Sequence, residues 1–208
     1  GVGFLAKDSL KSYEILFACS KINAVFVPIN WRLAAAEIAY ILRDANVEIL
    51  FVGSDFCQLV ESIRSEIDGV KTIIALEKTD HNCSMYDIWC QKPSDEPLNI
   101  TVKPSDVAVQ MYTSGTTGRP KGVQRGHYSF CAIAKEVALV GKSWIGLNKT
   151  DKSLFTLAAF HIGGLWWAIR WLASGLESMI LETFVDFEVL KAIEKYRITK
   201  TCLVPAMI

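Results

Sequence analysis

The chain has 208 residues, of which 51% are hydrophobic and 21% are charged, and this composition indicates a globular protein with a substantial buried core. Its 22 Lys and Arg residues balance its 22 Asp and Glu residues, so no net charge attracts a nucleic acid or an anionic membrane. The basic residues are scattered and form no stripe, and we therefore expect no nucleic-acid partner.

Apolar runs of strand length alternate with segments of helical period along most of the chain. This alternation predicts an α/β fold with mostly parallel sheets flanked by helices. In chain order, the expected strands are 2–5, 24–27, 49–52, 70–76, two strands around a loop at 112–123, and then 153–158, 178–181 and 201–204. The expected helices begin at residue 8 or 9 and then cover 34–44, 56–67, 128–140, 161–172 and 187–196.

Two of these helices have a predicted buried face. In the first helix, which Asp8 or Ser9 would cap, the apolar residues expected to face inward are Leu10, Tyr13, Leu16 and Phe17. In the second, they are Ile38, Ile41 and Leu42. The spacing of three to four residues in each set is typical of one side of an amphipathic helix.

Residues 77–104 interrupt the alternation. They are polar, contain three of the six prolines and show no sustained period, so they predict an irregular connection and a candidate break between two subdomains. His81, Cys83 and Cys90 could be proposed as metal ligands here. Without a second paired set of ligands, a surface loop is the favoured interpretation.

The six cysteines include no Cys-x-x-Cys pair and no dense spacing that would predict a disulfide framework. Cys19, Cys131 and Cys202 lie in apolar patterns, where a free thiol behaves as a small hydrophobic side chain. This usage favours a reducing compartment, and we expect a cytoplasmic protein. Peripheral association with a membrane stays open.

No membrane-spanning helix and no signal peptide are predicted. The most apolar run, 154–169, is interrupted by His161 and ended by Arg170, short of the roughly 20 residues that a spanning helix needs. The first five residues lead directly to Lys7 and Asp8, without the charged and then apolar order of a signal peptide.

The segment from Tyr112 to Val123 has the composition of a phosphate-binding loop. Its glycines let main-chain N–H groups approach a ligand, and its hydroxyls and lysine suit phosphate oxygens. The candidate phosphate-binding residues are Thr113, Ser114, Gly115, Thr116, Thr117, Gly118 and Lys121. An ordinary glycine-rich hairpin is the alternative, but a turn needs only one or two of these residues. The segment is not a Walker A loop, because Pro120 precedes the lysine and Gly122 follows it.

The order of residues in this segment closely resembles the phosphate-binding loop of the adenylate-forming, or AMP-binding, superfamily, which includes acyl-CoA synthetases. The resemblance covers the whole chain and is strongest to a fatty-acid or acyl-CoA synthetase. It implies that residues 1–208 form an incomplete N-terminal AMP-binding domain, the first part of the large domain, and that the C-terminal small domain is absent. Such a fragment is expected to be inactive alone.

A second segment, from Phe160 to Gly164, follows a predicted strand and opens a predicted helix. A single His at this place is usually a capping or core residue. In acyl-CoA ligases, however, the residue that His161 resembles borders the acyl pocket and positions the carboxylate. Peptide-synthetase adenylation domains carry an Asp that binds an amino group there, so His161 disfavours amino-acid activation.

The predicted helix after Gly164 is apolar on most faces. A buried core helix is one interpretation. In the other, the helix helps to wall an acyl pocket, whose candidate residues are His161, Gly163, Gly164 and Trp166. Relatives that act on long chains can carry a gating Trp near this point; the matching position here is Leu165, so that role is not carried over.

The resemblance implies an ATP-dependent carboxylic acid–CoA ligase that acts in two steps. A carboxylate attacks the α-phosphate of Mg-ATP, which gives an acyl-adenylate and pyrophosphate, and the thiol of coenzyme A then displaces AMP. Lys121, Thr117 and His161 are the predicted catalytic residues, and Thr113 is a candidate Mg²⁺ ligand. A homodimer is also compatible with the sequence.

Four alternatives stay open at this stage. The acceptor thiol could belong to a carrier protein, or the acid could be aromatic, as in aryl-CoA ligases. The protein could also be a luciferase-like relative. The last alternative is a nucleotide-binding module without catalytic activity.

Overall fold

The structure is a computed structural model that describes residues 1–78, 84–91, 98–113, 119–132 and 146–208. The chain divides into two compact units. The first comprises Gly1–Lys7 and Lys11–His127, and the second comprises Asp8–Leu10 and Tyr128–Ile208. Residues 77–104, where the sequence predicts a candidate break, lie within the first unit.

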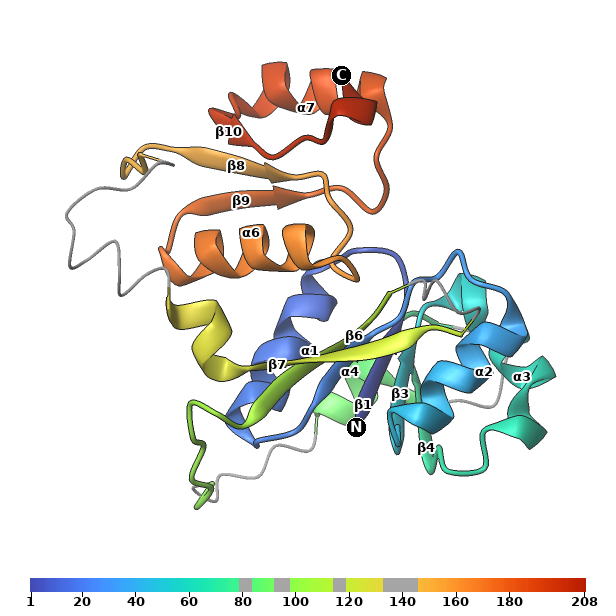
Figure 1. The fold of residues 1–208 in the computed structure, drawn as a ribbon. Coiled ribbons are helices and arrows are strands. Elements are labelled where there is room, and N and C mark those ends of the chain that lie inside the picture. The colour runs from blue at the N-terminus through green and yellow to red at the C-terminus, as the bar shows by residue number, and fades with distance from the viewer. Residues whose placement is uncertain (79–83, 92–97, 114–118, 133–145) are drawn as a thin grey trace. The chain divides into compact units, whose positions relative to one another are not determined.

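The first unit contains a seven-stranded sheet with the strand order β5-β4-β3-β1-β2-β6-β7 (Figure 1). Every neighbouring pair is parallel except β6 and β7, which are antiparallel. The prediction of an α/β fold with mostly parallel sheets is confirmed. The strands are β1 Val2–Leu5, β2 Phe26–Pro28, β3 Ile49–Val52, β4 Thr72–Ala75, β5 Ser84–Met85, β6 Val107–Thr113 and β7 Lys121–Gly126.

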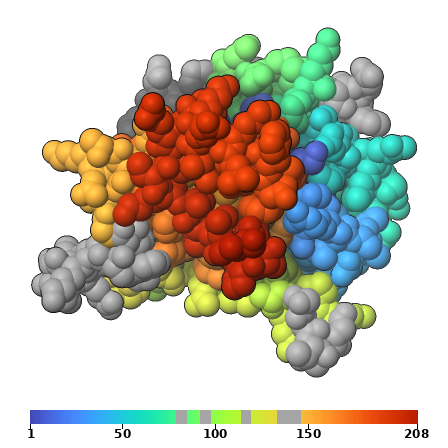
Figure 2. All heavy atoms as spheres, turned by 90° about the horizontal axis from the view of Figure 1, so that it is seen from above, coloured from blue at the N-terminus to red at the C-terminus, as the bar shows by residue number. Residues whose placement is uncertain are grey.

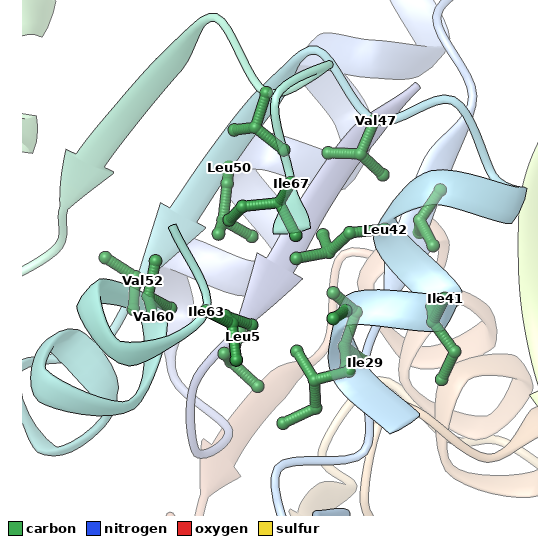
Figure 3. Packing of buried hydrophobic residues seen from close by; sticks show 14 of the residues in the cluster. Leu5, Ile29, Ile41, Leu42, Val47, Leu50, Val52, Val60, Ile63 and Ile67 are labelled. Carbon is green, nitrogen blue, oxygen red and sulfur yellow. The ribbon is translucent and has the colours of Figure 1, made fainter. Parts of the chain in front are cut away.

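A core of the first unit lies where two helices, α2 (Ala35–Asp44) and α3 (Cys57–Ser62), pack against β1, β2 and β3. Figure 3 shows the aliphatic side chains of this core, which come from both the helices and the strands. The predicted inward face of α2 is confirmed, because Ile38, Ile41 and Leu42 are all buried. Branched apolar residues on short strands and on one helix face therefore assemble one continuous core.

Helix α1 (Leu10–Lys21) differs from its predicted orientation. Tyr13 and Leu16 are buried as expected, but 66% of Leu10 and 41% of Phe17 are exposed. The buried side also carries Ser12, Ile15 and Cys19, so the contact face is rotated from the one predicted. Leu10 lies at the first helical position, where it extends beyond this face.

The helix predicted at 56–67 is broken into three pieces: a 3₁₀ turn at Ser54–Phe56, α3, and a second 3₁₀ turn at Arg64–Glu66. The break falls at Ile63, and both Ile63 and Ile67 are buried in the core of the first unit. Packing of these two side chains thus overrides the local helical period. The connection at 77–104 also holds regular structure that the sequence did not predict, namely β5 and a short helix, α4 (Tyr86–Cys90).

The second unit contains a three-stranded parallel sheet with the order β10-β8-β9. Its strands are β8 Lys152–Phe155, β9 Glu177–Ile180 and β10 Lys200–Thr201, and its helices are α6 Ile162–Ala173 and α7 Asp186–Tyr196. Figure 2 shows α7 and the C-terminal residues on the surface of this unit. Val189 and Ala192 of α7 pack against Leu154 of β8. Residues 127–132 are helical; the remainder of the helix predicted at 128–140 lies outside the described residues.

None of the helices in the described part of the chain has the length and apolar character needed to span a membrane.

Candidate active site

The β6–β7 hairpin of the first unit brings two predicted phosphate-binding residues opposite each other. β6 ends at Thr113, β7 begins at Lys121, and these two residues are Cα partners in the antiparallel pair. Both side chains are exposed. The two strands predicted around the motif are therefore confirmed. Ser114, Gly115, Thr116, Thr117 and Gly118, the predicted phosphate-binding residues between these strands, lie outside the described residues.

Lys121 offers a positive charge that no ion pair of the described residues neutralises. Its ammonium group can donate to three acceptors, and the hydroxyl of Thr113 can donate as well as accept. Two donors at the loop end of a hairpin, one of them charged, suit the oxygens of a phosphate group.

The hairpin also carries a polar cluster that the sequence did not single out. The hydroxyl of Tyr112 donates a hydrogen bond to Oδ2 of Asp44 at 2.6 Å and accepts one from Nε2 of Gln110 at 2.8 Å. Burial raises the pKa of the Tyr112 phenol, and the bond to Asp44 raises it further. The only signal in the sequence was the presence of two polar side chains, at 110 and 112, on one face of an otherwise apolar strand.

In the second unit, His161 occupies the N-cap position of α6. It lies in the segment that follows β8, and the carboxyl end of a parallel strand is where ligands of open α/β sheets usually bind. The His161 side chain is exposed, and its ring lies 4.6 Å from that of the buried Phe160, measured between centroids. The structure thus places His161 at the N-terminus of α6, which begins at Ile162, as the sequence predicts.

The two glycines after Ile162 have different surroundings. A Cβ atom on Gly164 would lie 2.3 Å from the main-chain oxygen of Ala158 and 2.5 Å from that of Leu157. A Cβ atom on Gly163 would meet only Cδ1 of Leu157, at 3.8 Å. Gly164 is therefore required by close packing at the start of α6, whereas Gly163 is an exposed position with space beside it.

The tryptophans of α6 divide between core and surface. Trp167 and Trp171 are buried, and Nε1 of Trp167 donates a hydrogen bond to Oγ of the buried Ser153 at 3.0 Å. Trp166, the predicted pocket residue, is half-buried, and Leu165 is only 1% exposed. The core interpretation therefore holds for one side of this helix, and Trp166 stays a candidate for the pocket wall.

Asp8 is a residue that sequence reasoning used only as a helix cap. Its two carboxylate oxygens accept the main-chain N–H of Ala159, at 3.1 and 3.2 Å. Ala159 lies two residues before His161, so Asp8 fixes the segment that presents the histidine. Nothing in the local sequence predicts this contact, because the two residues are 151 positions apart.

The first unit also contains a groove of about 460 Å³. Its apolar lining comes from Leu42, Val47, Ile67 and Val70, at the amino ends of β3 and β4. Its lining includes no predicted site residue. Within the described ranges, no group of three or more His, Cys, Asp or Glu side chains could hold a metal ion. The three proposed ligands of residues 81–90 are not tested by this, because His81 and Cys83 lie outside those ranges.

The sequence of the whole chain, residues 1–208, matches the family described as AMP-binding enzyme. The chain belongs to this family. This confirms the resemblance inferred from the phosphate-binding segment, and it shows that the hairpin carrying Thr113 and Lys121 is part of an AMP-binding domain.

Curated members of the AMP-binding family with similar sequences are named as ligases of carboxylic acids. A fatty acid–[acyl-carrier-protein] ligase of Streptomyces coeruleorubidus is 38% identical over 208 residues. An indoleacetate–CoA ligase of Aromatoleum aromaticum is 32% identical, and a long-chain-fatty-acid–CoA ligase of Mycobacterium tuberculosis is 30% identical. Each alignment covers 100% of this chain but only 38 to 40% of the relative. The chain thus spans about two fifths of the length of these relatives.

Solved structures of the AMP-binding family agree with the fold. An inhibitor-bound N-terminal domain of FACL13 from Mycobacterium tuberculosis matches with a TM-score of 0.84 and 29% identity, over 99% of this chain and 50% of that one. A long-chain-fatty-acid–CoA ligase from Archaeoglobus fulgidus matches with a TM-score of 0.84 and 26% identity, over 99% of this chain and 40% of that one. The described fold is therefore that of the N-terminal part of such enzymes.

Proposed function

We propose that the full-length protein is an ATP-dependent ligase that activates a carboxylic acid, with a fatty acid as the proposed substrate, as an acyl-adenylate. The observation that carries this proposal is the β6–β7 hairpin of an AMP-binding domain, which places Thr113 and Lys121 opposite each other. The carboxylate of the acid attacks the α-phosphate of ATP, a bond from its oxygen to phosphorus forms, and pyrophosphate leaves.

The roles of the hairpin residues follow from where charge develops in this step. Negative charge accumulates on the departing pyrophosphate, and a preorganised donor beside it stabilises the transition state by about 3 to 4 kcal/mol. Lys121 supplies such a donor, and Thr117 is proposed as a second one on the basis of the motif. His161 of the second unit is proposed to position the carboxylate, with Gly163, Gly164 and Trp166 near the acyl chain.

Mg²⁺ fits this proposal in a limited way. Magnesium in nucleotide sites is bound by substrate phosphates, water and one or two protein oxygens. Thr113 has an exposed hydroxyl at the loop end of the hairpin, and it would contribute one of those oxygens. The ion would offset the charge of the phosphates when ATP binds.

The acceptor of the acyl group is proposed to be the thiol of coenzyme A. Its sulfur attacks the carbonyl carbon of the acyl-adenylate, a thioester forms and AMP leaves. A carrier-protein thiol is the second candidate, favoured by the relative from Streptomyces coeruleorubidus, whose name specifies an acyl carrier protein. Incubation of the acyl-adenylate with either coenzyme A or a holo carrier protein, followed by mass spectrometry, distinguishes the two acceptors.

We also propose a cytoplasmic location, with peripheral association with a membrane surface as the alternative. The cysteines in the described part of the chain, namely Cys19, Cys57, Cys90, Cys131 and Cys202, are free thiols, which is usual in a reducing compartment. Homodimer formation stays a prediction from the sequence.

The test is carboxylate-dependent exchange of pyrophosphate into ATP by the full-length protein. Acetate, octanoate, palmitate and a cinnamate-type acid form a suitable panel. Exchange with one class identifies the acid and supports the adenylation step. If Mg-ATP binds but no acid supports exchange, the nucleotide-binding module replaces the ligase as the proposed function.

A further inference from the structure

A chain of polar side chains crosses the β6–β7 hairpin and ends on helix α2, all within the first unit. Nε2 of Gln124 donates to Oε1 of Gln110 at 3.0 Å. Gln110 in turn donates to the hydroxyl of Tyr112, which donates to Oδ2 of Asp44. The hairpin is thereby joined to a helix that ends 68 residues earlier in the sequence.

Tyr112, the central residue of this hydrogen-bonded series, lies directly beside the phosphate-binding residues. Tyr112 immediately precedes Thr113, and its partner across the hairpin is Gly122, which immediately follows Lys121. A Cβ atom on Gly122 would lie 3.1 Å from both Cζ and the hydroxyl of Tyr112, and 2.6 Å from Nε2 of Gln110. A glycine at residue 122 therefore leaves room for the Tyr112 side chain to cross the neighbouring strand, and a larger residue there would press on Tyr112.

The position of Asp44 is not explained by the stability of α2. Asp44 is the last residue of that helix and is exposed. A negative charge at this end interacts unfavourably with the helix dipole. The carboxylate does, however, accept the Tyr112 hydroxyl at 2.6 Å, which is the short distance typical of a charge-assisted hydrogen bond. Its evident contribution is therefore to the hairpin.

A second contact joins the other side of the hairpin to the same face of α2. The guanidinium carbon of Arg119, two residues before Lys121, lies 5.9 Å from the centre of the Tyr40 ring. The hydroxyl of Tyr40 approaches Oδ1 of Asp44 at 3.4 Å, as residues four apart on a helix can do. Helix α2 thus contacts the hairpin on both sides of its loop, through Tyr112 of β6 and through Arg119, which precedes β7.

We propose that Asp44, acting through Tyr112, is a positioning residue that holds Thr113 and Lys121 in the geometry required to bind the phosphates of ATP. The proposal rests on the proposed function, since it assumes that ATP binds at this hairpin. Neither Asp44 nor Tyr112 needs to touch the nucleotide. A binding group is effective only when the residues behind it keep it within a fraction of an ångström of its place.

Four single variants of the full-length protein distinguish a positioning role from a general loss of stability. Tyr112→Phe removes the hydroxyl and keeps the ring over Gly122, while Asp44→Ala removes its acceptor. Asp44→Asn keeps an oxygen that can accept the bond and serves as the conservative rescue. The matched control is Tyr86→Phe, which removes another tyrosine–carboxylate bond of the first unit, from Tyr86 to Oε2 of Glu14 at 3.1 Å.

The measurements are the dissociation constant of Mg-ATP by titration calorimetry, the KM values for ATP and for the acid in pyrophosphate exchange, and the melting temperature. We expect Tyr112→Phe and Asp44→Ala each to weaken Mg-ATP binding by about tenfold, the effect of one hydrogen bond to a charged group. KM for ATP should rise by a similar factor while KM for the acid stays unchanged. A double variant that combines Tyr112→Phe with Asp44→Ala should bind Mg-ATP no more weakly than either single variant, because both substitutions remove the same contact.

Asp44→Asn should recover most of the affinity, and Tyr86→Phe should match the wild type in all four measurements. The melting temperatures of Tyr112→Phe and Asp44→Ala should remain within about 4 °C of the wild type. Unchanged Mg-ATP affinity in both variants would overturn the proposal, as would an equal rise of KM for both substrates.

Failure of the proposed function gives a different result. If the wild type binds Mg-ATP but exchanges pyrophosphate with no acid, the ligase assignment fails, and the comparison of Mg-ATP affinities still decides the positioning role. If the wild type does not bind Mg-ATP, both proposals are wrong.

Discussion

At the scale of single residues, Lys121 provides the most direct test of the hairpin. We expect Lys121→Ala in the full-length protein to lower the rate of pyrophosphate exchange by about 100-fold, because one preorganised donor to the developing charge is lost. The melting temperature should not change, since the side chain is exposed. Thr117→Ala should have a similar effect on the rate, a prediction that depends on the motif alone.

The control for Lys121 is Lys191→Ala. Lys191 is also exposed, and its ammonium lies 3.5 Å from Glu188 on the surface of α7. This variant should retain the wild-type exchange rate. Equal rates for Lys121→Ala and Lys191→Ala would show that the hairpin lysine does not act on the phosphates.

Gly164 and Gly163 form a matched pair for stability. Gly164→Ala would place a methyl group 2.3 Å from the main-chain oxygen of Ala158, and we expect overpacking to cost about 1 to 3 kcal/mol. Gly163→Ala meets open space and should not lower the melting temperature, because Ala favours a helix over Gly by up to about 1 kcal/mol. Thermal unfolding of the two variants checks the difference, and the same loss in both would contradict the geometry at the start of α6.

At the scale of elements, the segment between β8 and α6 depends on Asp8. Asp8→Ala leaves the N–H of the buried Ala159 without its carboxylate acceptor, and an unsatisfied buried donor costs about 1 to 3 kcal/mol. We therefore expect a lower melting temperature together with a raised KM for the acid, because this segment presents His161.

Asp8→Asn supplies the comparison, since its amide oxygen can still accept one hydrogen bond. It should recover part of the stability and part of the KM. A wild-type melting temperature for Asp8→Ala would mean that the bond to Ala159 contributes nothing to the fold.

The elements that the sequence predicts best are those whose pattern is local. The strands at 2–5 and 49–52 and the buried face of α2 are confirmed, because continuous apolar runs and helical spacing are properties of short segments. The helix at 56–67 was predicted wrongly, since the buried positions of Ile63 and Ile67 depend on the sheet beneath them.

In the candidate site, too, local features could be predicted from the sequence and long-range contacts could not. The two strands around the motif were predictable from local alternation, and the structure shows that they pair with Thr113 opposite Lys121. The bond from Tyr112 to Asp44 could not be predicted in this way. It requires β6 to pair with β2 at Val109, so that a hairpin late in the sequence meets a helix formed much earlier.

At the scale of the whole molecule, acid should destabilise the fold through three carboxyl groups. The pKa of Glu48 is lowered by a hydrogen bond from Lys71, that of Asp106 by the main-chain N–H of Lys103, and that of Asp151 by the main-chain N–H of Asn148. The unfolded chain binds protons more readily at these sites, so stability falls as the pH falls.

The stabilisation is present above the ordinary carboxyl pKa values of 3.8 and 4.5 and is lost as the pH falls through the lower values of the folded state. Melting temperatures measured from pH 7 to pH 3 should therefore be steady at first and decline below about pH 4. Asp151→Asn should reduce the steepness of that decline. A melting temperature that rises on acidification would contradict the sign of all three effects.

Gly122 shows how a residue without a functional side chain can be restricted in sequence by its neighbours. It has no side chain to offer a phosphate, yet a Cβ atom there would press against Tyr112 and Gln110. Natural selection on ATP binding would then act on position 122 as well as on its charged neighbour, Lys121. Larger residues at 122 should be found together with smaller residues at 112 and 110, so these three positions should evolve together.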